Sequence, residues 1–295
     1  MKAYVILNPV AGGHDPQEAR EMLAHARDEG RWDYDLYETS GEEDLKKVVQ
    51  DALKKDYDMV VACGGDGTVS GVVDGLAHTE IPLGILPRGT ANAVATELGV
   101  PDALLSALEI LLSDHEFTMI DAIENNGRFY LLECSFGIFS ASFEDVNREE
   151  KDRFGWLAYV RAGLRNWIGL SPVRVSITID DHHRRFWGSE VSLFNTGQIG
   201  LVDEDLVGDI HMDDGVLDLY ALGSKSLWDI LQVLFYRVLS KPHEAPNVRY
   251  WRVRDHVRVE TVPKITWQAD GDVRGKTPAT FKVARASIRV IVPPA

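Results

Sequence analysis

Short apolar runs alternate with amphipathic stretches over the first 120 residues of the chain. Four apolar runs are typical of strands, at residues 3–9, 33–39, 58–65 and 82–89. The stretches between and after them have the spacing of amphipathic helices, at residues 16–30, 41–56, 69–78, 90–99 and 102–115. The third run is almost entirely apolar, as in a strand that is covered on both faces. This order predicts a parallel sheet with helices on its faces.

Beyond Thr118 the pattern changes to strands that follow one another. We expect them at residues 117–137, 173–195, 215–222, 255–262, 264–272, 279–284 and 287–293. A hairpin turn is predicted at Asn125-Asn126-Gly127, and two helices at residues 153–167 and 227–239. We therefore divide the chain into an α/β domain, residues 1–118, and an antiparallel β-sandwich, residues 119–295.

Composition narrows the class of protein. Of 295 residues, 45% are hydrophobic and 26% are charged, which is typical of a soluble globular protein. The formal net charge is −15, so a nucleic-acid partner is disfavoured. The same charge opposes contact with anionic membranes unless positive charge is concentrated locally.

Cellular location is suggested by two further features. Cys63 and Cys134 lie far apart in the sequence and form neither a metal-binding cluster nor a disulfide framework, which favours a reducing compartment. The apolar run at the N-terminus is too short for a signal peptide, and no stretch approaches the length of a membrane span. We expect a cytoplasmic protein whose contact with a membrane, if it has one, is peripheral.

The first candidate site is Gly64-Gly65-Asp66-Gly67-Thr68, directly after the apolar strand. Glycines let the backbone approach a bulky anion closely, and the start of the next helix directs unpaired N–H groups at the loop. A carboxylate among these donors suits a Mg²⁺ ion or an ordered water that lies between Asp66 and phosphates. The alternative is a tight turn that Asp66 merely caps.

The same sequence of strand, glycine turn and helix occurs twice more, at residues 86–99 (LPRGTANAVATELG) and 8–13 (NPVAGG). Thr90 adds a hydroxyl to the first of these. Because the carboxyl ends of parallel strands meet at one edge of a sheet, the three loops are expected to face one ligand.

These motifs together resemble the diacylglycerol-kinase-type lipid kinases, which include sphingosine and ceramide kinases and soluble bacterial enzymes. NAD kinases share GGDGT, and the PRGTAN element distinguishes the lipid kinases from them. The resemblance covers nearly the whole chain and implies an ATP site in the cleft between an NAD-kinase-like α/β domain and a β-sandwich. It implies that these residues border the nucleotide: Asn8, Gly12, Thr39, Gly64, Gly65, Asp66, Gly67, Thr68, Ser70 and Thr90. Asp66 would act with the catalytic Mg²⁺.

Two acidic motifs lie in the second predicted domain. In MDDGVLDL, residues 212–219, a surface turn before a strand is the simple interpretation, whereas the resemblance implies a structural Mg²⁺. Its ligands would be the side chain of Asp214 and backbone carbonyls near His211 and Val216.

The second acidic motif is QADGD, residues 268–272, which a hairpin with exposed acids also explains. A kinase that acts on an alcohol needs a group that accepts the hydroxyl proton. Asp270 and Asp272 are the candidates, and the sequence leaves open which of them is the base. The family's motif usually reads Asp-Gly-Glu, so Asp272 replaces a glutamate.

Two departures from the family pattern concern the nucleotide loops. The usual Asp after Asn92 is Ala93, and a Lys common after the first loop is absent, since Gly13 and His14 stand there. Arg88 or Arg20 could supply the missing positive charge. Together with the motifs, the family resemblance implies an ATP- and Mg²⁺-dependent kinase of a lipid alcohol such as diacylglycerol. The alternatives are an NAD kinase and a catalytically weak protein that binds nucleotide and lipid.

Membrane contact is suggested by a segment that combines basic and aromatic residues, at 147–172, and by a helix with few polar positions, at 226–243. Packing of these stripes against the sandwich is the commoner explanation. The run His182-His183-Arg184-Arg185 is interpreted as a solvated hairpin tip rather than a metal site. The family resemblance also makes a homodimer plausible.

Overall fold

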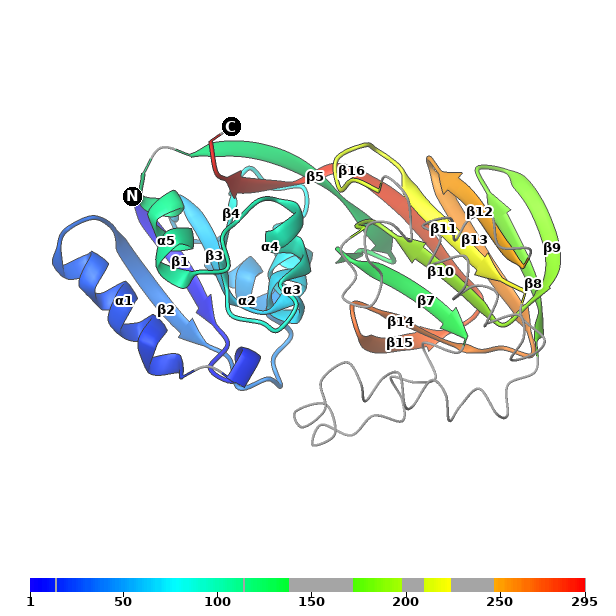
Figure 1. Ribbon diagram of the computed structural model, residues 1–295, viewed down its shortest axis with the longest axis horizontal. Coiled ribbons are helices and arrows are strands. Elements are labelled where there is room, and N and C mark those ends of the chain that lie inside the picture. Colours follow the sequence, from blue (N-terminus) through cyan, green and yellow to red (C-terminus); the bar gives the residue numbers. More distant parts are fainter. Residues whose placement is uncertain (14, 114, 138–171, 198–209, 224–246, 295) are drawn as a thin grey trace. The chain divides into compact units, whose positions relative to one another are not determined.

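The structure is a computed structural model that describes residues 1–13, 15–113, 115–137, 172–197, 210–223 and 247–294 (Figure 1). The chain forms two compact units. The first contains Met1–Ala122, Arg128–Leu131 and Arg285–Ala295, and the second contains Ile123–Gly127 and Leu132–Ala284. The helices predicted at 153–167 and 227–239 lie outside the described residues.

The first unit is built on a parallel sheet in the order β2-β1-β3-β4. Its strands are β1 (Lys2–Leu7), β2 (Asp33–Glu38), β3 (Met59–Gly64) and β4 (Leu83–Pro87). Every residue of β3 and β4 is buried, as their apolar sequences predict for central strands. The end of the chain joins this unit because the last part of β16 (Ala279–Val292) pairs in parallel with β4 through Val290 and Leu83.

The helices of the first unit follow its strands. They are η1 (Ala11–Gly13), α1 (Pro16–Asp28), α2 (Leu45–Ala52), α3 (Asp66–Leu76), α4 (Ala93–Glu97) and α5 (Leu104–Leu112). Asp15 caps α1 by accepting the Gln17 N–H. α2 starts later than predicted because the Glu43 carboxylate binds the backbone N–H groups of Ser40 and Gly41 in a turn.

The second unit contains two sheets. One is antiparallel in the order β12-β11-β10-β7-β14-β15. Its strands are β7 (Glu133–Gly137), β10 (Glu190–Phe194), β11 (Leu217–Leu222), β12 (Val248–Val253), β14 (Thr266–Ala269) and β15 (Asp272–Lys276). Phe136 and Trp267 of this sheet each meet Phe281 edge to face, at centroid distances of 5.5 and 5.1 Å. Phe281 belongs to the other sheet, so these rings form part of a sandwich core.

The other sheet contains the first part of β16, followed by β13 (His256–Val262), β8 (Val173–Ile179) and β9 (His182–Gly188), with antiparallel neighbours. β5 (Glu116–Asn125) pairs with β16 and with β6 (Arg128–Tyr130). The fold class predicted from the sequence, an α/β domain and an antiparallel sandwich, is thus confirmed.

Three details differ from the sequence prediction. β12 and β15 were not predicted; both lie at sheet edges, where exposed positions blur the alternation of apolar and polar residues. The segments predicted at 279–284 and 287–293 form one strand, in which Ala286 has φ 43° and donates its N–H to Asp121. The end of β16 from Arg285, which the sequence division placed with the sandwich, belongs to the first unit, where Val290 pairs with Leu83 of β4.

Candidate functional site

Two of the glycine loops meet at the carboxyl end of the parallel sheet. A Cβ atom built on Gly89 would lie 2.6 Å from the Cα atom of Gly65, and one built on Gly65 would lie 3.0 Å from the Cα atom of Gly89. Real Cβ atoms do not approach backbone at the shorter distance, so only glycine fits at position 89. The GGDGT loop after β3 and the PRGTAN loop after β4 are therefore in direct backbone contact.

The third loop joins them through Asn8. Its side-chain amide donates to the Thr68 hydroxyl at 3.2 Å, and its backbone N–H donates to the carbonyl of Cys63 at 2.9 Å. Thr68 is buried and stands so close to Gly64 that a Cβ atom on that glycine would lie 2.4 Å from the Thr68 hydroxyl oxygen. The three loops that the sequence singled out thus come together in one unit.

Arg88, a residue of the PRGTAN loop, supplies a buried positive charge and contacts the other two loops. Its side chain is 4% exposed, and its guanidinium donates to the carbonyl of Asn8 at 3.1 Å. The backbone N–H of Arg88 donates to the carbonyl of Gly64 at 2.9 Å. Arg20, the other cation that the sequence offered, forms a two-bond ion pair with Glu38 at the surface. Of these two side chains, only Arg88 is tied to the loops.

Asp66 stands at the first position of α3 and links two of the loops. One of its carboxylate oxygens accepts the backbone N–H of Val94 at 3.3 Å, close to the start of α4. Asn92, which directly precedes α4, adopts left-handed backbone angles, and its side-chain oxygen accepts the N–H of Gly89 at 2.7 Å. α3 begins at Asp66, earlier than predicted, because the Gly65 carbonyl accepts the N–H groups of Thr68 and Val69.

The other predicted nucleotide residues differ in exposure. Gly12, with φ 62°, Gly67 and Thr90 are exposed. Thr39 and Ser70 are buried, and the N–H of Thr39 donates to the carbonyl of Leu7 at 2.9 Å, next to Asn8. The exposed residues can contact a ligand directly, whereas the buried ones shape the loops.

In the second unit, the predicted acidic turn is bound to the start of β7. One carboxylate oxygen of Asp270 accepts the backbone N–H groups of Leu132 and Glu133, at 2.9 and 3.1 Å. The Asp270 N–H donates to the Glu133 carbonyl at 3.1 Å. Asp272 instead lies at the surface, with a side chain 72% exposed that pairs with Arg274 at 3.0 Å. The two acids therefore differ: Asp270 is a fixed part of the turn, and Asp272 is accessible.

Glu133, the first residue of β7, contacts this turn and was missed by sequence reasoning. Its carboxylate accepts from the amide of Gln268 at 2.6 Å, and that amide also donates to Ser135 at 2.7 Å. Burial raises the pKa of Glu133 to about 7; the Gln268 amide opposes this shift and the nearby Asp270 carboxylate adds to it. No local motif marks Glu133, because it reaches the turn only through the pairing of β7 with β14.

The acidic motif at residues 212–219 lies next to a cationic side chain, that of Arg252. Asp214 accepts the N–H of Val216 at 3.1 Å, and the guanidinium of Arg252 lies 3.9 Å from its other oxygen. Arg252 also lies 3.6 Å from the buried Asp218, whose pKa burial raises. Since a guanidinium already faces Asp214, the fit to a divalent ion is poor. We therefore derive no step from the metal that the family resemblance implied at His211, Asp214 and Val216.

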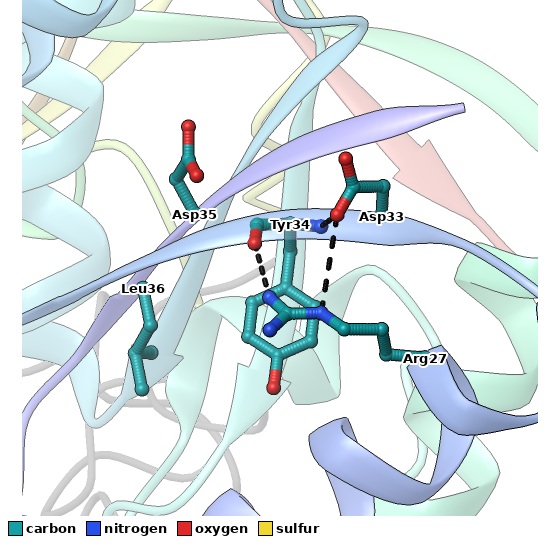
Figure 2. Close-up of a pocket in the computed structure, with 5 residues that line it drawn as sticks. All are labelled: Arg27, Asp33, Tyr34, Asp35 and Leu36. Atoms are coloured by element: carbon teal, nitrogen blue, oxygen red, sulfur yellow. Dashed lines mark hydrogen bonds and ion pairs between the residues drawn. The ribbon is translucent and has the colours of Figure 1, made fainter.

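A surface hollow lies elsewhere on the first unit, as Figure 2 shows. It is lined by Arg27, Asp33, Tyr34, Asp35 and Leu36. The Arg27 guanidinium stacks on the Tyr34 ring at 3.6 Å and also binds the Tyr34 carbonyl. Asp33 begins β2, whereas the glycine loops follow the carboxyl ends of their strands. This hollow is therefore separate from the glycine loops.

Comparison with known proteins identifies the family of this chain. The family model of the diacylglycerol kinase catalytic domain matches residues 2–124, and that of the YegS C-terminal NAD kinase beta sandwich-like domain matches residues 134–292. The chain belongs to the diacylglycerol kinase catalytic-domain family. Among the described residues, no helix of this family member is long and apolar enough to cross a membrane.

Relatives of this diacylglycerol kinase family member are similar over almost its whole length. An uncharacterized Synechocystis protein is 31% identical and aligns with 98% of the chain and 70% of its own length. A diacylglycerol kinase of Bacillus subtilis is 26% identical, over 99% of this chain and 96% of its own. A crystal structure of a diacylglycerol kinase from Bacillus anthracis has a TM-score of 0.79 at 23% identity, over 99% of this chain and 97% of its own. This structural similarity supports the fold described above.

Proposed function

We propose that this protein is an ATP- and Mg²⁺-dependent kinase that phosphorylates the hydroxyl of a lipid alcohol such as diacylglycerol. The observation that carries the proposal is the meeting of the three glycine loops, through the contact of Gly65 with Gly89 and the bond from Asn8 to Thr68. Loops of this kind present backbone N–H groups to phosphates. The buried guanidinium of Arg88, which bonds to the carbonyl of Asn8, adds positive charge to the loops.

Asp66 is the residue we assign to the metal of the reaction. It is a hard oxygen donor, it is only partly buried, and the bond to Val94 fixes its place between two phosphate-binding loops. Mg²⁺, when bound with ATP, neutralises charge on the phosphates during transfer. The position after Asn92, where the family usually has a second acid, holds Ala93, which is 5% exposed. Metal binding would therefore depend more heavily on Asp66.

Asp272 is the residue we assign as the general base. Asp270 has its N–H and one carboxylate oxygen engaged with the backbone of β7, so it positions the turn. Asp272 is accessible to a substrate hydroxyl. It would accept the hydroxyl proton while the alcohol oxygen forms a bond to the γ-phosphorus and the bond to the β,γ-bridging oxygen breaks. ADP is then the leaving group.

The test is transfer of labelled phosphate from ATP, with Mg²⁺, to a panel of lipid alcohols in mixed micelles. The panel contains diacylglycerol, phosphatidylglycerol and a sphingoid base, and NAD is a parallel soluble acceptor. We expect transfer to at least one lipid, loss of transfer when EDTA removes the metal, and loss in Asp66→Ala. Transfer to NAD alone would support an NAD kinase. ATP binding without transfer to any acceptor would support a weakly active binding protein and contradict the proposal.

A further inference from the structure

One face of the second unit gathers positive charge on a chain whose formal net charge is −15. Figure 1 shows β9, β8 and β13 side by side, in the order in which they pair. In β8, Val175, Ile177 and Ile179 are buried. Because side chains alternate along a strand, the residues between them lie on the opposite face of the sheet.

The register of the strands gives the composition of that opposite face. Trp187 of β9 and Val262 of β13 flank Arg174 on β8, and Arg185 and Glu260 flank Ser176. In the next rows Arg258 lies opposite Thr178 and Lys282 lies opposite His256. We call this surface the basic face and define it by its cationic and apolar members: Arg174, Arg185, Arg258, Lys282, Trp187 and Val262.

The basic face is positively charged and carries exposed apolar groups. In the rows of Arg174, Arg185 and Arg258 the register places one carboxylate, Glu260, which pairs with Arg258 at 2.7 Å. Asp181 and Asp255 lie beside His256, in the row of Lys282 at the other end of the face. Trp187 is 53% exposed and Val262 is 64% exposed. The Arg174 guanidinium lies 5.8 Å from the centre of the Trp187 ring, and Lys264, just beyond Val262, is also exposed. The apolar groups and the surplus cations thus share one end of the sheet.

We infer that the basic face is the surface by which this protein contacts an anionic lipid bilayer. Basic side chains near such a bilayer each contribute about 1 kcal/mol of attraction, and tryptophan favours the headgroup layer. The exposed apolar side chains of Trp187 and Val262 favour a bilayer over nucleic acid, because they can enter the headgroup layer. The inference rests on the proposed function, because a lipid kinase has to reach its substrate in a membrane.

The experiment measures binding to vesicles in the absence of ATP, so that its outcome does not depend on catalysis. Co-sedimentation is measured with phosphatidylcholine vesicles and with vesicles that also contain phosphatidylglycerol. We expect binding to the anionic vesicles only, and weaker binding as salt is raised. In the double variant Arg174→Glu/Arg185→Glu, the partition coefficient should fall at least tenfold. Trp187→Ser should reduce binding at high salt as well, because it removes an apolar contact.

A matched control distinguishes the effect of losing charge on the basic face from the effect of changing the net charge of the protein. Lys54 and Lys55 are exposed in the first unit, so Lys54→Glu/Lys55→Glu makes the same change in charge elsewhere. We expect this control to bind as the wild type does. Equal loss in both double variants, or unchanged binding in Arg174→Glu/Arg185→Glu, would overturn the inference. Circular dichroism and thermal unfolding check that each variant is folded.

The same variants also test two other partners for the basic face, a second copy of the chain and DNA. A change in mass by light scattering, from an oligomer to a monomer in Arg174→Glu/Arg185→Glu, would make the basic face an interface between copies and overturn the membrane assignment. The assignment would also be overturned if the wild type bound a DNA duplex as tightly as it binds anionic vesicles and Arg174→Glu/Arg185→Glu lost that binding. Phosphate transfer to a short-chain diacylglycerol in micelles is measured separately. If the wild type transfers phosphate but does not bind vesicles, this inference fails while the proposed function stands.

Discussion

Gly65 and Gly89 face each other so closely that neither loop leaves room for a side chain between them. The Cβ position of Gly89 lies 2.6 Å from the Cα atom of Gly65 and 2.7 Å from the side-chain oxygen of Asn92. The contact holds together two loops that follow neighbouring parallel strands, β3 and β4. The relative placement of the candidate phosphate-binding loops therefore depends on two glycines that are 24 residues apart in the sequence (89 − 65).

The first prediction concerns this contact. Gly89→Ala should force the two loops apart, because the nearest obstacle is backbone and cannot rotate away. We expect destabilisation of about 1–3 kcal/mol and at least a tenfold loss of ATP affinity, measured by thermal unfolding and isothermal titration calorimetry. Gly67→Ala is the control for stability, since a Cβ atom there meets nothing within 4 Å. Wild-type affinity in Gly89→Ala would contradict the proposed role of the contact.

The sequence predicted the order of the elements in the first unit and the three loops, because both depend on local patterns. A buried strand followed by glycines and a helix can be recognised within about twenty residues. That the loops meet follows from parallel topology alone, since strands such as β3 and β4 end at the same edge. Local sequence and topology thus determine this part of the site together.

The parts that the sequence could not predict depend on contacts between distant segments. Glu133 reaches Gln268 because β7 pairs with β14, and Arg252 reaches Asp214 although 38 residues separate them (252 − 214). The basic face is likewise invisible in any single strand, because its cations are assembled by the register of β9, β8, β13 and β16. Pairing of this kind leaves no periodic signal in one segment.

The second prediction separates the roles of the two acids in the QADGD turn. Asp272→Asn should lower the turnover number by about 10²–10⁴-fold, the usual contribution of a general base, with little effect on thermal stability because the side chain is exposed. Asp270→Ala should instead destabilise the protein by about 1–3 kcal/mol, since the N–H groups of Leu132 and Glu133 lose their acceptor. Steady-state kinetics and thermal unfolding measure the two effects. Full activity in Asp272→Asn would refute the assignment of the base.

The third prediction concerns the two thiols. Burial raises the pKa of Cys63 to about 12, although the Arg88 guanidinium acts in the opposite direction, and burial also raises the pKa of Cys134. Because the thiolate is the reactive form, neither residue should react at pH 8 in the folded protein. Labelling with a chromogenic disulfide should be slow in buffer and complete in guanidinium chloride. Rapid labelling of Cys63 without denaturant would show that the loops above it open readily.

The fourth prediction follows from the raised pKa of Glu133. The folded protein holds this proton up to about pH 7, whereas the unfolded chain releases it near the ordinary glutamate value of about 4.3. The folded state therefore binds more protons than the unfolded state between these values, and the free energy of unfolding must fall as pH rises through that window. With about 1.4 kcal/mol for each unit of pKa, the loss over the whole window is on the order of 4 kcal/mol.

Glu133→Gln tests this prediction because glutamine keeps an acceptor but does not titrate. The amide of Gln268, which donates to Glu133 at 2.6 Å, can still bond to the new side-chain oxygen. Denaturant unfolding of both proteins is measured at pH 5 and at pH 8 by tryptophan fluorescence. The variant should lose less stability than the wild type between the two values, and the difference between the proteins isolates Glu133 from every other titrating group. Parallel pH dependence in the two proteins would show that Glu133 is ionised in the folded state well below pH 7, and that the Gln268 amide outweighs the cost of burial.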